Sequence, residues 1–171
     1  MTTPLQAFIA APPDPDRRVA IDAVERAARR HPQALAFLGL WRDRKQAGTP
    51  LGRADFPSRA LLGFMPHLTI LEPIEGGQTW KLRLVGTAIC LRFGADPTGW
   101  TIDQLYPGER AVEQARHYRR VAETAGYRVT EGRVAGAARD HLAVEFVNIA
   151  IEPPTPGLHW VASGVFVSEE S

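Results

Sequence analysis

One stretch of the chain, RLVGTAICLRFGADPTGW, has the outline of a phosphate-binding turn, because a strand pattern runs through glycine into a helical segment. Its glycines are Gly86, Gly94 and Gly99, so neither the G-x-G-x-x-G nor the G-x-x-x-x-G-K-[ST] spacing is present. The sequence therefore predicts a structural turn without a nucleotide. We expect Thr87 to cap a helix over residues 88–93 and Gly94 to end it.

Two further turn signals follow along the chain. The residues DPTG at 96–99 have the preferences of a type I turn, and TIDQ at 101–104 matches a capping box for a short helix. Asp55, Asp96 and Asp103 all fall in such loop or cap positions. Local hydrogen bonds to the backbone therefore explain these carboxylates without catalysis.

Metal and acid–base chemistry find little support in the sequence. The histidines, at positions 31, 67, 117, 141 and 159, show neither H-x-x-x-H nor H-E-x-x-H spacing, so no metal site is predicted. The chain has no G-x-S-x-G elbow and no evident pair of inward carboxylates. His141 and Glu145 share one face of a strand, but alternation predicts that this face is exposed to solvent. We therefore predict no catalytic residues.

Composition narrows the class of protein. The chain has 171 residues, 44% of them hydrophobic, and a formal net charge of +1, so it suits one domain with a real core and does not suit nucleic acid binding. A single cysteine, Cys90, excludes an internal disulfide. No apolar run approaches the roughly 20 residues of a membrane span, and the N-terminus lacks a basic leader. We expect a cytoplasmic protein that does not enter the membrane.

The periodicity of the chain predicts an α+β domain. Helical segments are expected at 16–30, 33–46 and, briefly, 58–66. Strand patterns follow at 67–75 and 79–85, and three more lie near the C-terminus at 127–136, 141–153 and 158–170. Hairpin-length connections favour an antiparallel sheet with the middle helices over one face. The inward strand residues are expected to be Leu68, Ile70, Ile74, Trp80, Leu82 and Leu84. We divide the chain into an N-terminal extension, 1–33, and a domain, 34–171.

The helix expected at 16–30 is amphipathic. Its apolar stripe runs through Val19, Ala23 and Ala27, with charged residues on the opposite face. A single helix of this length is not stable alone in water, so the stripe must cover a surface. That surface is either the chain's own sheet or the same helix of a second chain. Two-fold pairing is the commonest association of small proteins, and we expect a homodimer.

Taken together, these residues resemble the PAS-domain family of small alphaproteobacterial proteins long catalogued as a domain of unknown function. The family pattern has Trp and Arg on a leading helix, a Pro-x-Arg-x-Asp-Phe-like loop with one residue between its proline and arginine, Arg-hydrophobic-Val-Gly-Thr, and Gly-x-Asp-x-Thr-Gly. The match covers residues 34–168, although here Leu51 and Gly52 separate the loop proline from its arginine. The matching positions, expected to be mainly structural, are Trp41, Arg44, Pro50, Arg53, Asp55, Phe56, Arg83, Val85, Gly86, Thr87, Gly94, Asp96, Thr98, Gly99 and Tyr118.

The resemblance implies a PAS-like five-stranded antiparallel sheet with helices on one face, and sensing or regulation without catalysis. PAS domains commonly bind a small molecule between sheet and helices, or mediate dimerisation. Asn148, on the same strand face as Phe146, is the best polar candidate for such a pocket. The candidate pocket residues are Trp80, Leu84, Cys90, Phe93, Trp100, Phe146, Asn148 and Trp160.

No cofactor is predicted. Some photosensory PAS proteins attack a flavin with a helix cysteine, but the sequence around Cys90, ICLRF, lacks their motif. Some oxygen sensors ligate haem from the helix that corresponds to residues 108–125. His117 lies on that helix, roughly 100° from the centre of its apolar face, and is expected to be solvated. Haem and flavin are therefore both disfavoured.

Three functions remain open from the sequence. The first is a sensory or regulatory module that binds a small ligand or a protein partner and transmits a signal, and the sequence favours it. The second is a ligand-free dimerisation or interaction adaptor. The third is a small α+β cone enzyme of the isomerase type, which would need an inward acid near a tyrosine. No kinase or DNA-binding segment is visible, so a signalling protein partner is expected.

Overall fold

The architecture is seen in a computed structural model, which describes residues 31–106, 108–133 and 142–169. The helix expected at 16–30 and the histidine at position 141 lie outside this part of the chain.

A single antiparallel sheet forms the centre of the molecule. The strand order is β2-β1-β5-β4-β3, and every neighbouring pair is antiparallel. The order places the C-terminal strand at the middle of the sheet, between the first and fourth strands. This arrangement confirms the predicted α+β class and five-stranded sheet. The strands are β1 Leu68–Ile74, β2 Thr79–Val85, β3 Tyr127–Arg133, β4 Leu142–Ile151 and β5 Trp160–Glu169.

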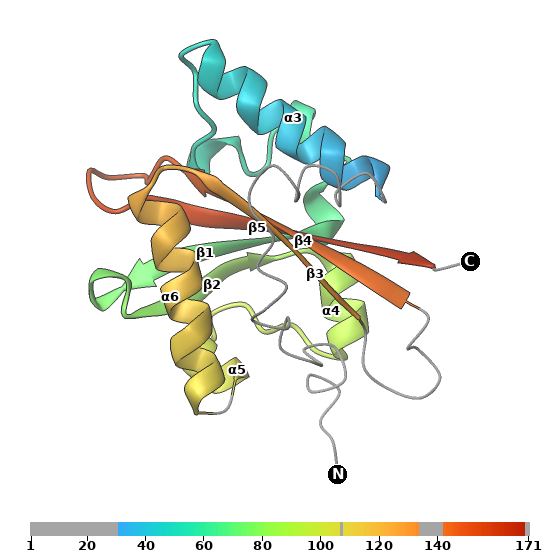
Figure 1. Cartoon of the computed structure of the whole chain (residues 1–171), viewed down its shortest axis with the longest axis vertical. Helices are drawn as coiled ribbons and strands as arrows, with labels where there is room; N and C mark the ends of the chain where they lie inside the picture. The colour runs from blue at the N-terminus through green and yellow to red at the C-terminus, as the bar shows by residue number, and fades with distance from the viewer. Residues whose placement is uncertain (1–30, 107, 134–141, 170–171) are drawn as a thin grey trace.

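Helices cover the sheet on both faces (Figure 1). The middle helices α4, α5 and α6 pack on one face, as predicted, and we call it the inner face. The leading helix α3 packs on the opposite face, the outer face, where its Phe37, Leu38 and Trp41 enter the core. The sheet is therefore the middle of three layers. The helices are α3 Pro32–Gln46, α4 Thr87–Phe93, α5 Ile102–Leu105 and α6 Glu109–Glu123.

Short 3-10 turns replace the helix expected at 58–66. The chain forms two of them there, η4 Arg59–Leu61 and η5 Met65–His67. Two others, η3 Arg53–Asp55 and η6 Glu75–Gly77, lie in neighbouring connections. A nine-residue segment interrupted by glycine and proline has too few hydrogen bonds to offset helix nucleation.

A β-bulge in β2 places residues of this strand, all of them predicted to point inward on one face, on two different faces of the sheet. The register between β1 and β2 shifts at Ile70/Leu71, where Arg83 is the extra residue on β2. Trp80 and Leu82 lie on the inner face, whereas Leu84 packs against the outer core. The prediction that Leu84 shares a face with Trp80 was wrong, because a bulge reverses the alternation.

Glu145 was also predicted wrongly, as a solvent-exposed residue. It lies on the outer face with Val147 and is only 2% exposed. Strand alternation correctly placed Glu145 on the face opposite Val144 and Phe146. That face is not exposed to water, because helices cover both sides of the sheet.

The turn around Gly86 is structural. Gly86 is the N-cap residue of α4, and no side chain caps the helix there. Thr87, which was predicted to be the cap, is the first residue of the helix. Gly94 ends α4 in the left-handed conformation, as predicted. The following turn is shifted by one residue from the prediction, because the Trp100 amide donates to the Pro97 carbonyl. The capping box at 101–104 is confirmed by a 2.9 Å hydrogen bond from the Thr101 amide to Gln104 Oε1.

Gly86 is required by close approach, not by its backbone angles. A Cβ atom there would lie 2.3 Å from the Pro66 carbonyl oxygen and 2.4 Å from that of Met65. Its amide donates to the Leu68 carbonyl at 2.8 Å. At Gly99, in contrast, glycine is required by the backbone conformation: its φ is +90°, whereas a Cβ atom would have open space around it.

Replacing Gly86 with alanine should destabilise the fold by about 3 kcal/mol or more, because backbone atoms must move to admit the methyl group. Gly39, inside α3, is a matched control, because a Cβ there meets nothing within 4 Å. Gly39→Ala should stabilise the protein by about 0.5–1 kcal/mol. Denaturant unfolding of both variants decides the point, and equal stabilities would contradict it.

A candidate ligand site on the inner face

Three buried polar side chains form a row across the inner face of the sheet. Thr69 on β1 is the register partner of Ser163 on β5, and Ser163 is in turn the partner of Asn148 on β4. Their exposed fractions are 9%, 5% and 3%. We call these three residues the polar row. Arg128 on β3 is the register partner of Asn148 and extends the same line toward the sheet edge.

His117 of α6 ties the polar row to the helix above it. Its Nε2 lies 2.8 Å from Asn148 Nδ2, and its Nδ1 lies 3.4 Å from a guanidinium nitrogen of Arg128. Only one end of the Asn148 amide can face His117, whichever way the amide is turned. As oriented, Oδ1 is buried and has no hydrogen-bond partner among the residues that the structure describes. A buried amide oxygen without a partner requires a hydrogen-bond donor, from water or from a ligand.

Apolar residues flank the polar row on both sides. Leu71, Val161 and Ala150 lie next to it in the inner core under α6. Val165 and Phe146 lie on its other side, near α4. A polar strip within an apolar surface is the composition typical of a small-molecule site.

An aromatic group supports the helical side of the site. Trp80 donates from Nε1 to the Ala115 carbonyl at 3.2 Å and packs edge-on against Tyr118, with 5.8 Å between ring centroids. Tyr118 in turn contacts the His117 ring at 5.7 Å. These contacts fix the face of α6 that carries His117.

The tyrosine hydroxyls beside this group are buried. Part of the Tyr106 ring is exposed, but burial of its hydroxyl beside Tyr118 raises the pKa of Tyr106 to about 12. Burial raises the pKa of Tyr118 well above its usual value as well, and the neighbouring Tyr106 adds to the shift. Both phenols are therefore held in the neutral form.

The structure brings together only some of the predicted pocket residues. Asn148, Phe146 and Trp80 lie on the inner face with the polar row. Phe93 packs edge-on against Trp100 at 5.9 Å, but Trp100 is 40% exposed. Leu84 and Trp160 belong to the outer core instead.

Cys90, on α4, is half-buried. Its Sγ lies 3.8 Å from the Val85 carbonyl oxygen. Burial, followed by the negative charge of Asp96, raises the pKa of this thiol. A thiol held in its protonated form is a poor nucleophile.

Sequence reasoning missed four residues of the site: Thr69, Ser163, His117 and Arg128. Thr69 and Ser163 are single polar residues within apolar strand patterns, and strand alternation alone could have placed Ser163 between Val161 and Val165 on the inner face. His117 was predicted to be solvated, and this was wrong. The side of α6 that it occupies faces Arg128 and Asn148 on the sheet, which helical geometry alone does not reveal.

The leading-helix and loop residues of the family pattern have structural contacts. Trp41 donates from Nε1 to the Ala150 carbonyl at 2.8 Å and so ties α3 to β4. Arg44 donates to the Thr49 carbonyl at 2.7 Å and pairs with Asp55 at 3.4 Å. Arg53 donates to the Phe56 carbonyl at 2.6 Å. These residues fix the loop after α3.

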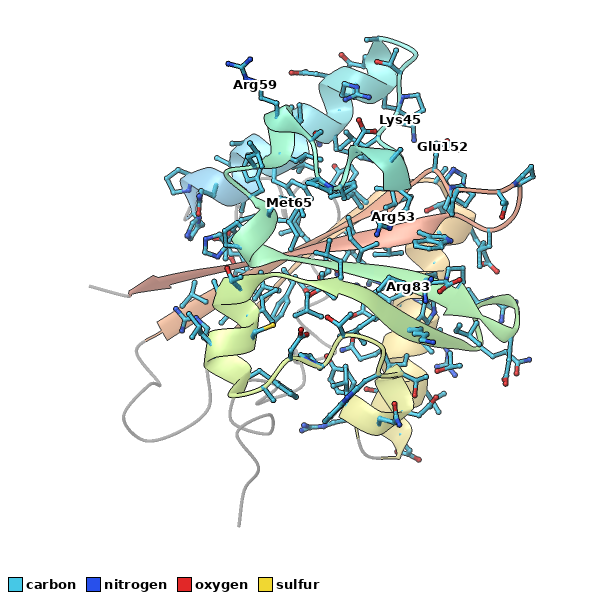
Figure 2. The ribbon with its side chains drawn as sticks, turned by 180° about the vertical axis from the view of Figure 1, so that it is seen from behind. Lys45, Arg53, Arg59, Met65, Arg83 and Glu152 are labelled. Atoms are coloured by element: carbon cyan, nitrogen blue, oxygen red, sulfur yellow. The ribbon has the colours of Figure 1, made fainter. Side chains whose placement is uncertain are left out.

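That loop is joined to the end of β4. The Arg53 amide donates to the Glu152 carbonyl at 3.0 Å, and the Glu152 amide donates to Leu51 at 2.9 Å. Figure 2 shows Arg53 and Glu152 at the same end of the molecule as Lys45. The Arg83 side chain pairs with Glu72 at 3.1 Å on the neighbouring hairpin.

No group of three or more His, Cys, Asp or Glu side chains in the described ranges is arranged to hold a metal ion. None of the helices in those ranges combines the length and the apolar content needed to cross a bilayer.

The fold resembles that of a solved PAS domain structure. The structure of the PAS domain from Bordetella pertussis BvgS matches with a TM-score of 0.51 and 21% sequence identity, over 69% of this chain and 88% of that chain. At this identity the likeness shows the fold alone. A comparison with curated protein sequences gives no significant match.

The family follows from the sequence match. A PAS domain family model matches residues 29–153, which is most of the chain. The chain therefore belongs to the PAS domain family, and PAS domains are in general sensory and regulatory modules. This confirms the resemblance drawn from the residues.

The two buried tyrosines predict a loss of stability at high pH. Because their folded-state pKa values lie above the ordinary value of about 10, the neutral forms stabilise the fold fully below pH 10. This contribution should fall as pH rises from 10 through 12, by on the order of 2 kcal/mol for Tyr106. Denaturant unfolding across this range, with Tyr106→Phe as control, measures it. Phenolate absorbance from all three tyrosines near pH 10 would contradict the prediction.

Proposed function

We propose that this chain is a sensory or regulatory module that binds a small molecule at the polar row and transmits the signal without catalysis. The ligand lies between the inner face and the helices α4 and α6. Thr69, Ser163 and Asn148 supply hydrogen bonds, and the flanking apolar residues contact the rest of the molecule. His117 is a positioning residue, since it holds the Asn148 amide from α6.

One observation carries this proposal. Asn148 is 3% exposed, yet Oδ1 is buried without a hydrogen-bond partner in the described part of the chain. A buried polar atom left without a partner destabilises a fold by about 1–3 kcal/mol. Asparagine in the middle of an otherwise apolar strand surface is better explained by a ligand that contacts it than by packing.

The ligand is neither haem nor a flavin adduct. His117 uses both ring nitrogens in contacts with Asn148 and Arg128, so an axial bond to iron would break one of them. Cys90 is held as a protonated thiol, which disfavours attack on a flavin. We expect a colourless small molecule.

The signal passes to a protein partner, and the module acts as a homodimer. The apolar stripe of residues 19–27 provides the dimer contact, supported by Leu35, which is 39% exposed on α3. Leu38 and Trp41 of the same helix are buried in the outer core and cannot contribute to this contact. A ligand-free adaptor remains the second candidate, favoured by the predominantly apolar packing of the inner face.

Native mass spectrometry of freshly purified protein tests ligand binding. We expect a retained mass on the natural chain and on Ser58→Ala, and none on Ser163→Ala or Asn148→Leu. Ser58 is a matched control, because its hydroxyl is also buried but lies away from the polar row, at the N-cap of η4. An absorption spectrum of the same sample should show no visible band.

Retention of the same mass by Asn148→Leu would reject the site. Protein with no bound mass from several expression hosts would favour the adaptor. A Soret or flavin band would overturn the assignment of a colourless ligand.

Light scattering tests the dimer. The full chain should have the mass of two copies, and a form lacking residues 1–30 should be a monomer. This truncation keeps His31, whose Nδ1 accepts from the Gln33 amide at the start of α3. A monomeric full chain, or a truncated form that stays dimeric, would refute the proposed contact.

A further inference from the structure

The contacts of His117 form a chain of hydrogen bonds with a fixed direction. A guanidinium nitrogen of Arg128 lies 3.4 Å from His117 Nδ1. A guanidinium group has only donors and keeps its charge in proteins, so Arg128 is the donor in this contact. Nδ1 is therefore the ring nitrogen without a proton, and in a neutral imidazole the proton then lies on Nε2.

This direction continues into the Asn148 amide. As oriented, its Nδ2 lies 2.8 Å from His117 Nε2, but two N–H groups cannot bond to each other. A half-turn of the amide exchanges Nδ2 and Oδ1 and leaves the rest of the side chain in place. The Nε2–H group of His117 then donates to Oδ1, and the NH2 group of Asn148 is turned toward the polar row.

The other end of the same amide is the buried position that has no hydrogen-bond partner in the described part of the chain. After the half-turn this position is occupied by the NH2 group. What it requires is therefore a hydrogen-bond acceptor, which the ligand must provide.

Ser163 adds a second donor beside this amide. It is the register partner of Asn148 on the neighbouring strand, and such partners have Cβ atoms about 5 Å apart. One carbonyl oxygen has two lone pairs, so it can accept from the Ser163 hydroxyl and the Asn148 amide together. Thr69 lies one strand farther away, roughly 10 Å from Asn148, and can reach a different part of the same molecule.

The surroundings of these donors favour an acceptor without charge. Arg128 is directed at the His117 ring, and the side chains that flank the polar row are apolar. An ionised group placed among them would lack a partner of opposite sign. The flanking residues are Leu71, Ala150 and Val161 on one side and Phe146 and Val165 on the other.

On the basis of the proposed ligand site, we infer that the ligand is an uncharged, mainly apolar molecule with a carbonyl-type oxygen. This oxygen accepts hydrogen bonds from the Asn148 NH2 group and the Ser163 hydroxyl. His117 and Arg128 are positioning residues, because they determine which end of the Asn148 amide faces the ligand. Ketones, lactones and amides fit this description, whereas carboxylates do not.

The tautomer of His117 tests the direction of the hydrogen bonds without any ligand. Nitrogen-15 NMR of the full chain at about pH 8, where an ordinary histidine is neutral, distinguishes a proton on Nε2 from one on Nδ1. We expect the proton on Nε2, and in Arg128→Met we expect both tautomers, because Nδ1 has lost its donor. A proton on Nδ1 in the natural chain would overturn the inference and leave the polar row as a site for a donor-bearing ligand.

Three small probes test the ligand class. Acetophenone, ethylbenzene and benzoate share a ring and a similar size but carry a ketone, no polar group and a carboxylate. In NMR titrations of the full chain, acetophenone should bind about tenfold more tightly than either of the others. Ser163→Ala should reduce its advantage over ethylbenzene about threefold or more, because one donor is lost. Ser58→Ala should leave that advantage unchanged.

The outcomes separate the ligand class from the site itself. Equal binding of acetophenone and ethylbenzene, or tighter binding of benzoate, would overturn the inferred class and leave the ligand site in place. A ligand retained on the natural chain is judged in the same way, because an ionised or oxygen-free molecule would contradict the inference. Failure of every probe to bind, with no retained mass, would reject the site and the inferred class together.

Discussion

Burial of the sheet on both faces is the constraint on which the rest of this structure depends. α3 covers one face and α4, α5 and α6 cover the other, so the central strands β1, β5 and β4 have almost no solvent-facing side (Figure 1). In such a sheet, every polar side chain must find a partner within the protein or from a bound molecule. Thr69, Ser163, Asn148 and Glu145 are the residues on which this demand falls.

Several residues of the family pattern fix the positions of these layers relative to one another. Gly86 lets the chain pass against the carbonyls of Met65 and Pro66 before α4 begins. Trp41 joins α3 to β4, and Arg44 and Asp55 fix the loop that follows. Their role explains why the family pattern is rich in glycine, arginine and aspartate. Strand β4 carries buried polar residues on both sides, Asn148 on the inner face and Glu145 on the outer face.

The sequence predicted the class of fold and the strands well, because period-two alternation and glycine punctuation are local signals. Asn148 and Phe146 were correctly placed on one face by that alternation. Leu84 was misplaced because the bulge at Arg83 depends on pairing with β1, which one strand alone does not show. Glu145 and His117 were assigned to solvent because the contacts that shield them come from elements distant in sequence. Thr69 and Ser163 are brought together only by the pairing of β1 with β5, which neither strand's sequence reveals alone.

The central claim is that the polar row binds a small molecule. A crystal structure of freshly purified protein, at a resolution that distinguishes water from organic density, tests it most directly. We expect non-protein density between β5 and α6, with one atom within hydrogen-bond distance of the Asn148 amide end that does not face His117. Density for a single water on that amide, with α4 and α6 packed closely over Ser163, would contradict the account and leave the chain as a ligand-free adaptor.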